Sequence, residues 1–337
     1  MRRVSLALQG GGAHGAFTWG VLDRLLEEDD LEIAGISGTS AGALNGAALK
    51  AGLIAGGRGA ARKRLDRLWT QVGEIGDFRM LPWIAPFLPA MRFWQAASAA
   101  VLPFSPQAVA AQLYSPYAFG QSWSNPLAPV ARDLDFANLS DRRGPRLFVS
   151  ATNVRTGKIK IFTGREITPD ALLASACLPT VFQTVEIDGE GYWDGGFSGN
   201  PALFPLYEPD LPDDILVVSI NPMRRDDIPD TPLEIQNRIN EISFNSSLLS
   251  ELRAINFVRR LIAEGRMEAG KMKAVNVHMI SDDKLMNELS AESKQTPTPY
   301  LLKRLKAAGR AAAEQFLRNG GAKIGQDASA DLPGLLG

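Results

Sequence analysis

The chain has 337 residues, of which 45% are hydrophobic, so it can bury a large core. Its formal net charge of −1 provides no basic field for nucleic acid, and its single cysteine, Cys177, excludes an internal disulfide. Neither the spacing of the Cys and His residues nor the placement of the carboxylates indicates a metal site.

The first predicted elements are a strand and a helix joined by a glycine-rich turn. Residues 4–8 form a short apolar run typical of a buried strand, and apolar residues recur at helical spacing over 17–26. The consecutive glycines 10–12 would lose much backbone entropy in a regular element, so they indicate a turn. Backbone N–H groups at a helix N-terminus favour a negative group. The turn therefore predicts an anion pocket, which His14 would line.

A dinucleotide site is the first hypothesis for this turn, because Gly10-x-Gly12-x-x-Gly15 is the fingerprint of such sites. The fingerprint also expects an Asp or Glu about 20 residues later, at the end of the second strand. The second predicted strand, residues 33–37, ends instead in Gly38-Thr39-Ser40-Ala41-Gly42. A P-loop is disfavoured as well, since no Gly-Lys-Ser/Thr follows the glycines.

Gly38-x-Ser40-x-Gly42 matches the nucleophile elbow, a tight strand-to-helix turn that exposes a serine hydroxyl above the sheet. A predicted strand precedes this turn, and the small apolar residues 43–49 follow it as a predicted helix. If the strands before the two glycine turns are parallel neighbours, both turns open at the same sheet edge. The N–H groups of the first turn would then form an oxyanion hole over the serine.

A serine nucleophile needs a base, which is usually a histidine that a carboxylate orients. The chain has two histidines, His14 in the first turn and His278 in an alternating, strand-like run. A structural role suits His278 better, although a Ser, Asp, His order would permit it in a triad. The other candidate base is Asp194, which a predicted hairpin over 185–193 carries to a strand end before Gly195-Gly196.

Three motifs in this order resemble the patatin-like phospholipases and acyl hydrolases. They are Gly10-Gly11-Gly12-Ala13-His14-Gly15, Gly38-Thr39-Ser40-Ala41-Gly42 and Asp194-Gly195-Gly196, and the later Asn200-Pro201 is also similar to the family pattern. The family commonly has Lys or Arg where this chain has His14. The resemblance covers about residues 4–55 and 145–221.

The resemblance implies an α/β fold of three layers, α/β/α, with a mostly parallel central sheet and the elbow after the second strand. It implies a Ser40–Asp194 dyad that cleaves lipid or other carboxylic esters, in the manner of a phospholipase A or lysophospholipase, without a cofactor. The oxyanion hole would consist of backbone N–H groups of Gly10, Gly11, Gly12 and Ala41. The supporting motif residues would be His14, Gly15, Gly38, Gly42, Gly195 and Gly196.

Two other classes of function stay open. An acyltransferase would use the same serine but pass the acyl group to an acceptor other than water. A lipid- or nucleotide-binding module would keep the pocket without chemistry. Kinship of fold does not fix the substrate, so neither the natural acyl donor nor the oligomeric state is predicted.

Residues 77–130 combine aromatic residues with many prolines, which suits neither a strand nor a long helix. We expect one of two arrangements for this segment. It is either an apolar cap, which admits acyl chains or contacts a lipid surface, or an irregular insertion packed on the core. The hydrolase domain is predicted to span 1–324 with this segment inside it, and 325–337 is predicted to be a flexible tail.

The remaining predicted elements are strands at 146–153, 158–162 and 215–220 and helices at 231–265 and 299–319. The apolar run that follows Met1-Arg2-Arg3 is too short for a signal peptide, and no stretch reaches the ~18 apolar residues of a membrane helix. We therefore expect a cytoplasmic protein, with peripheral contact as its only route to a membrane.

Overall fold

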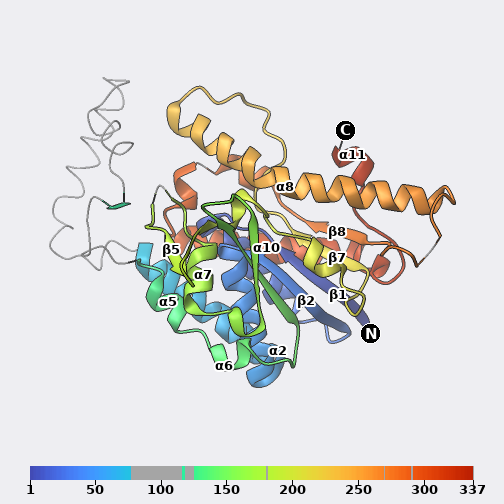
Figure 1. Ribbon diagram of the computed structural model, residues 1–337, viewed down its shortest axis with the longest axis horizontal. Coiled ribbons are helices and arrows are strands. Elements are labelled where there is room, and N and C mark those ends of the chain that lie inside the picture. Colours follow the sequence, from blue (N-terminus) through green and yellow to red (C-terminus); the bar gives the residue numbers. More distant parts are fainter. Residues whose placement is uncertain (77–115, 118–124, 180, 269, 290, 337) are drawn as a thin grey trace.

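The computed structural model of the chain describes residues 1–76, 116–117, 125–179, 181–268, 270–289 and 291–336 (Figure 1). Over these residues, the strands form one eight-stranded sheet. The strands are β1 Arg2–Leu8, β2 Leu31–Thr39, β3 Arg146–Asn153, β4 Ile159–Thr163, β5 Val185–Ile187, β6 Glu190–Asp194, β7 Asp214–Val218 and β8 Asn276–Ile280. Each strand predicted from the sequence is present, with its ends shifted by a few residues at most.

The sheet has the strand order β5-β6-β3-β2-β1-β7-β8, and β4 pairs with β3 outside this path. The pairs β1–β2, β2–β3, β1–β7 and β7–β8 are parallel, whereas β4 and β6 run antiparallel to β3. The predicted α/β class with a mostly parallel central sheet is confirmed. Because β1 and β2 are parallel neighbours, the turns that follow them open at the same edge of the sheet.

The described α-helices are α1 Gly15–Leu25, α2 Ala41–Gly76, α5 Ala128–Arg132, α6 Phe136–Leu139, α7 Pro169–Ser175, α8 Pro232–Ala263, α9 Asp283–Glu288, α10 Pro299–Asn319 and α11 Leu332–Leu336. Short 3₁₀ turns are η1 Gly12–His14, η5 Gly164–Glu166, η6 Gly195–Phe197, η7 Phe204–Tyr207, η8 Ala291–Lys294 and η9 Gly321–Lys323. Among the helices of the described ranges, none has the length and apolar character needed to cross a bilayer.

Helices cover both faces of the sheet, which gives the predicted three layers (Figure 1). The side chains of β7 show the alternation that this arrangement requires. Leu216 and Val218 belong to the core that α1, α2, α7 and α10 cover, whereas Ile215 and Val217 belong to the core that α8 and α11 cover. Alternate residues of one strand therefore anchor opposite helical layers.

Close backbone packing joins α10 to α1, the helix that follows the first glycine turn. A Cβ atom at Gly309 would lie 2.0 Å from the carbonyl oxygen of Phe17, and one at Gly20 would lie 2.0 Å from that of Lys306. A side chain at either glycine would force the two helices apart. The α10 helix thus supports the helix that follows the glycine turn.

The last segment of the chain contacts the sheet. Ser329 and Ala330 both donate backbone N–H groups to the carbonyl oxygen of Val277, and Leu332 is buried in the core beneath α8. These contacts lie within 325–337, for which a flexible tail stays a prediction.

Most of the predicted cap lies outside the described residues. Of the segment 77–130, the structure describes 116–117 and 125–130. The Pro116 carbonyl accepts a bond of 3.1 Å from the side-chain amide of Gln183. Whether the segment is a cap or a packed insertion stays a prediction.

Candidate active site

Ser40 occupies the turn between β2 and α2 with a φ of 54°, the left-handed conformation of a nucleophile elbow. Glycines flank it because there is no room for side chains. A Cβ at Gly38 would lie 2.6 Å from the Gly42 carbonyl oxygen, and one at Gly42 would lie 2.1 Å from that of Leu8. The Ser40 backbone N–H donates to the Ser175 hydroxyl at 2.8 Å. The turn is therefore held in its strained conformation from α7.

Two strand ends meet beside β3. β2 pairs with the first part of β3 as far as Thr39 opposite Ser150, and β6 pairs with its last part, where Asp194 lies opposite Ala151. Because the pairing of β4 with β3 overlaps both stretches, β2 and β6 share the other edge of β3. Ser150 and Ala151 are consecutive, so the ends of β2 and β6 face each other. This arrangement brings Ser40, the residue after β2, to Asp194.

The Asp194 carboxyl group is buried and holds its proton unusually tightly. Burial raises its pKa to about 7, while hydrogen bonds from the Gly196 backbone N–H and the Ser40 hydroxyl act in the opposite direction. The Gly196 bond to Oδ1 measures 2.7 Å. The backbone of Asp194 is fixed as well, since its N–H donates to the Cys177 carbonyl at 2.8 Å and its carbonyl accepts from the Thr152 hydroxyl at 2.9 Å.

The glycine loop, residues 10–15, lies directly against the elbow. A Cβ at Gly10 would lie 2.7 Å from the Ser40 Cβ, and one at Gly15 would lie 2.6 Å from the Ala41 Cβ. The Gly10 N–H donates to Asn200 Oδ1 at 2.6 Å, so it is not free to bind an oxyanion. This bond therefore corrects the prediction that the Gly10 N–H group is an oxyanion donor. Within the described residues, the N–H groups of Gly11, Gly12 and Ala41 have no acceptor.

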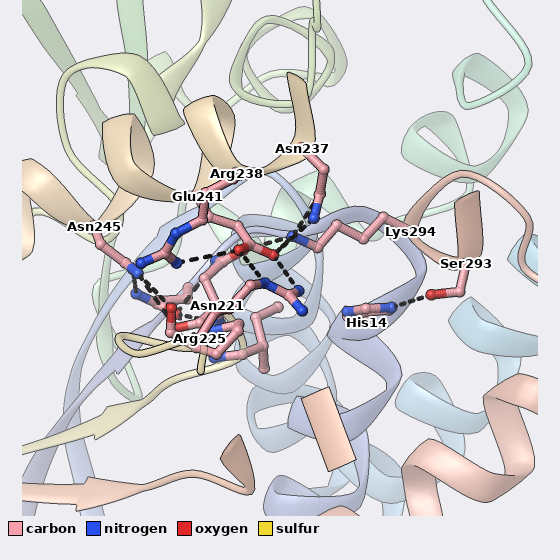
Figure 2. A network of polar contacts seen from close by, with 12 residues as sticks. His14, Asn221, Arg225, Asn237, Arg238, Glu241, Asn245, Ser293 and Lys294 are labelled. Carbon is pink, nitrogen blue, oxygen red and sulfur yellow. Dashed lines mark hydrogen bonds and ion pairs between the residues drawn. The ribbon is translucent and has the colours of Figure 1, made fainter. Parts of the chain in front are cut away.

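Buried amide side chains hold the glycine loop from the segments beyond β6. Asn221 Nδ2 donates to the Gly10 carbonyl at 2.7 Å, and Gln9 Oε1 accepts the backbone N–H of Asn221 at 3.0 Å. Asn245 on α8 accepts a bond of 3.1 Å from Gln9 Nε2 and lies beside Asn221 (Figure 2). Sequence reasoning missed Asn221 and Asn245, because isolated asparagines have no diagnostic spacing. The Asn200-Pro201 pair was the one signal that pointed to this cluster.

His278 lies away from the elbow and has its own partners. It is on β8, and β1 and β7 separate that strand from β2. Its Nε2 lies 2.8 Å from Asp214 Oδ1 and its Nδ1 lies 2.9 Å from the Ser329 hydroxyl. This environment is that of a structural histidine, away from Ser40.

His14 is buried at the end of the glycine loop, where its Nε2 lies 2.7 Å from the Ser293 hydroxyl. Burial, and next the nearby Lys294, lower its pKa to about 3. The imidazole is therefore neutral near pH 7. Its position adjoins the expected anion pocket, and the nearby positive charges are those of Lys294 and Arg225.

Comparison with known proteins places these motifs in a family. The family model described as patatin-like phospholipase matches residues 6–207, which is more than half of the chain. The solved structure of VipD from Legionella pneumophila is similar at 16% identity and a TM-score of 0.42, over 94% of this chain and 67% of that one. No curated protein matches the chain. On the family match, the chain belongs to the patatin-like phospholipase family, whose members are lipid acyl hydrolases.

Proposed function

We propose that the chain is a serine acyl hydrolase that cleaves lipid or other carboxylic esters through Ser40 and Asp194. The observation that carries this proposal is the meeting of the two strand ends, which sets a buried carboxyl group against the hydroxyl of an elbow serine. A free aspartate is a weak base, whereas general bases work best with a pKa near the operating pH. With a pKa of about 7, Asp194 is matched to the task.

The reaction proceeds in two acyl transfers. The Asp194 carboxylate takes the Ser40 proton as Oγ attacks the ester carbonyl carbon, and Gly11, Gly12 and Ala41 donate N–H groups to the developing oxyanion. The intermediate collapses as the C–O bond to the alcohol breaks, and Asp194 returns the proton to the leaving oxygen. Water then attacks the acyl carbon and gives its proton to Asp194. The bond between this carbon and Ser40 Oγ breaks, Asp194 returns the proton to Oγ, and the carboxylic acid leaves.

An apolar groove beside the Asp194 turn supports an acyl chain as part of the substrate. Phe197, at the end of η6, is exposed, as are Ile239 and Ile242 on α8. Together with small serines of α8 these side chains line a groove of about 480 Å³. Exposed large apolar side chains that gather beside a functional site indicate an apolar ligand.

The extent of the domain is part of the same proposal. We place the hydrolase domain at residues 1–324, with 77–130 as an insertion or cap, and peripheral membrane contact as its means of reaching lipid. The α10 helix supports this extent, because it packs on α1 beside the glycine loop.

The test is labelling of the purified chain with a fluorophosphonate probe, followed by mass spectrometry and by turnover of a short soluble ester. Wild type is expected to be labelled at Ser40, and Ser40→Ala and Asp194→Asn are expected to lose about 10³-fold or more in turnover. Ser5→Ala is the matched control, since it removes a buried hydroxyl of β1 that has no partner in the described part of the chain. Absence of labelling in folded wild type, or turnover by Ser40→Ala, contradicts the proposal.

A further inference from the structure

A buried carboxylate beside the glycine loop has no part in the proposed reaction. The Glu241 side chain, on α8, is fully buried and surrounded by cations (Figure 2). Arg225 donates two bonds of 2.8 Å to its oxygens, Lys294 donates one of 2.9 Å, and Arg238 lies at 3.4 Å. Burial alone would raise the pKa of Glu241, but Arg225 and Lys294 lower it to about 2. The carboxylate therefore stays charged and gathers positive side chains around it.

Lys294 is the cation that reaches the loop. Its side chain is 16% exposed, and its ammonium donates to Glu241 on α8, to Asn237 Oδ1 at 3.3 Å and to Asn221 Oδ1 at 3.4 Å. Asn221 in turn donates to the Gly10 carbonyl. The Asn221 side chain thus links Lys294 to Gly10, the first residue of the glycine loop.

The backbone of the same short turn, η8, contacts the middle of the loop. A Cβ at Gly12 would lie 2.2 Å from the Lys294 carbonyl oxygen, so the two backbones are in direct contact. The adjacent Ser293 hydroxyl lies 2.7 Å from His14 Nε2. The stretch from Gly10 to His14 is therefore held at both ends by η8 and the groups bound to it.

We propose that Lys294 is a positioning residue that fixes the glycine loop through its ion pair with Glu241. This inference rests on the proposed function, because the loop supplies the oxyanion donors Gly11 and Gly12 in that reaction. The ion pair ties η8 to α8, and η8 then backs Gly12 while Asn221 holds Gly10. Without the pair, η8 loses its anchor and the two N–H groups lose their fixed direction.

The expected signature is a fall in kcat with little change in KM, because Lys294 does not contact the substrate. Small displacements of catalytic groups cost up to about 10²-fold, and loss of one oxyanion donor costs about 10²–10³-fold. For Lys294→Met we expect about a 30-fold fall in kcat and in the rate of fluorophosphonate labelling at Ser40. Lys294→Arg keeps the charge and the donors, so it is expected to retain at least about a third of the wild-type rate.

Lys273→Met is the matched control. Lys273 is also partly buried and donates three bonds, to the carbonyl oxygens of Leu206, Glu208 and Leu211. It precedes β8, at the opposite end of the sheet from the elbow. Its loss is expected to lower the melting temperature while kcat and the labelling rate of the folded protein stay within about twofold of wild type.

The experiment measures kcat and KM for a short soluble ester, the labelling rate at Ser40, and thermal unfolding, in the full chain and all three variants. The inference is supported if Lys294→Met is folded and slow, Lys294→Arg recovers, and Lys273→Met is unaffected. Equal rates for Lys294→Met and Lys273→Met overturn it. If Lys294→Met does not fold, Glu241→Gln is compared with Lys294→Arg in its place, and a wild-type kcat in Glu241→Gln overturns the inference. Unlabelled wild type instead contradicts the proposed function itself.

Discussion

Gly10 donates its backbone N–H to Asn200 Oδ1 at 2.6 Å, and Asn200 Nδ2 returns a bond of 3.3 Å to the Gly10 carbonyl. The two residues are 190 positions apart. Asn200 follows the Asp194 turn by a few residues, and Gly10 touches the elbow of Ser40. This reciprocal pair therefore couples the glycine loop, Ser40 and Asp194 into one unit.

The acylation rate is expected to rise with pH through a midpoint of about 7, which is the pKa of Asp194 in the folded chain. The base must be ionised to accept the Ser40 proton, so activity is low below the midpoint and reaches a plateau above it. The measurement is kcat/KM for a short ester together with the labelling rate between pH 5 and pH 9. A profile that is flat over this range would contradict an Asp194 base of raised pKa.

Asp194→Asn is expected to be more stable than wild type at pH 8 although it is inactive. The pKa of Asp194 is raised from 3.8 to about 7 on folding, so the stability of wild type falls as pH rises between these values. Above pH 7 the folded chain keeps a buried carboxylate, which the amide of Asn replaces without charge. Thermal unfolding should show a gain of several degrees at pH 8 and a smaller one at pH 5. An equal gain in melting temperature at pH 5 and pH 8 would contradict the ionisation of a buried Asp194 between these pH values.

Gly12→Ala is expected to damage the site far more than Gly11→Ala. Gly12 has a φ of 59°, and its added Cβ would meet the Lys294 carbonyl oxygen at 2.2 Å. The nearest atom to a Cβ at Gly11 is the end of the Ile220 side chain at 3.0 Å, which can shift. We expect the labelling rate to fall by about tenfold or more in Gly12→Ala and by about threefold at most in Gly11→Ala. Equal falls in the labelling rate of the two variants would show that the oxyanion donors lie elsewhere in the chain.

Ile242→Asn is expected to impair cleavage of long-chain esters selectively. Each CH₂ group that loses its apolar contact costs up to about 0.8 kcal/mol, so the kcat/KM for a dodecanoate ester should fall by about tenfold. The kcat/KM for a butyrate ester should stay within about twofold. Ile235→Asn is the control, because Ile235 is an exposed isoleucine of α8 outside the groove. An equal fall in kcat/KM for both esters would show that the groove does not bind the acyl chain.

The fold could be predicted where the pattern is local. The run predicted as a strand at 146–153 is β3, and the helix predicted at 299–319 has the bounds of α10, because its apolar spacing lies within one segment. The elbow was predictable for the same reason, since strand, glycines and serine are consecutive. Asp194 could be found only by its turn chemistry and by a resemblance of motifs.

The groups that fix the site could not be predicted in this way. Asn221, Asn245, Glu241 and Lys294 reach the glycine loop from loops and helices that are distant in sequence. A single buried amide or ion pair leaves no periodicity, and its partner is set by the tertiary packing of α8 and η8. The bond that engages Gly10 N–H is likewise invisible until the chain folds.

The order of these segments along the chain has a consequence for synthesis. Ser40 and Asp194 lie within the first 207 residues, which the family model matches, whereas Asn221, Glu241 and Lys294 follow later. A ribosome therefore produces Ser40 and Asp194 well before Asn221, Glu241 and Lys294, whose contacts hold the glycine loop in the folded chain. A chain terminated between residues 207 and 294 would contain all three sequence motifs and still lack an organised site. Under the proposed function, premature products of translation would thus be poor catalysts.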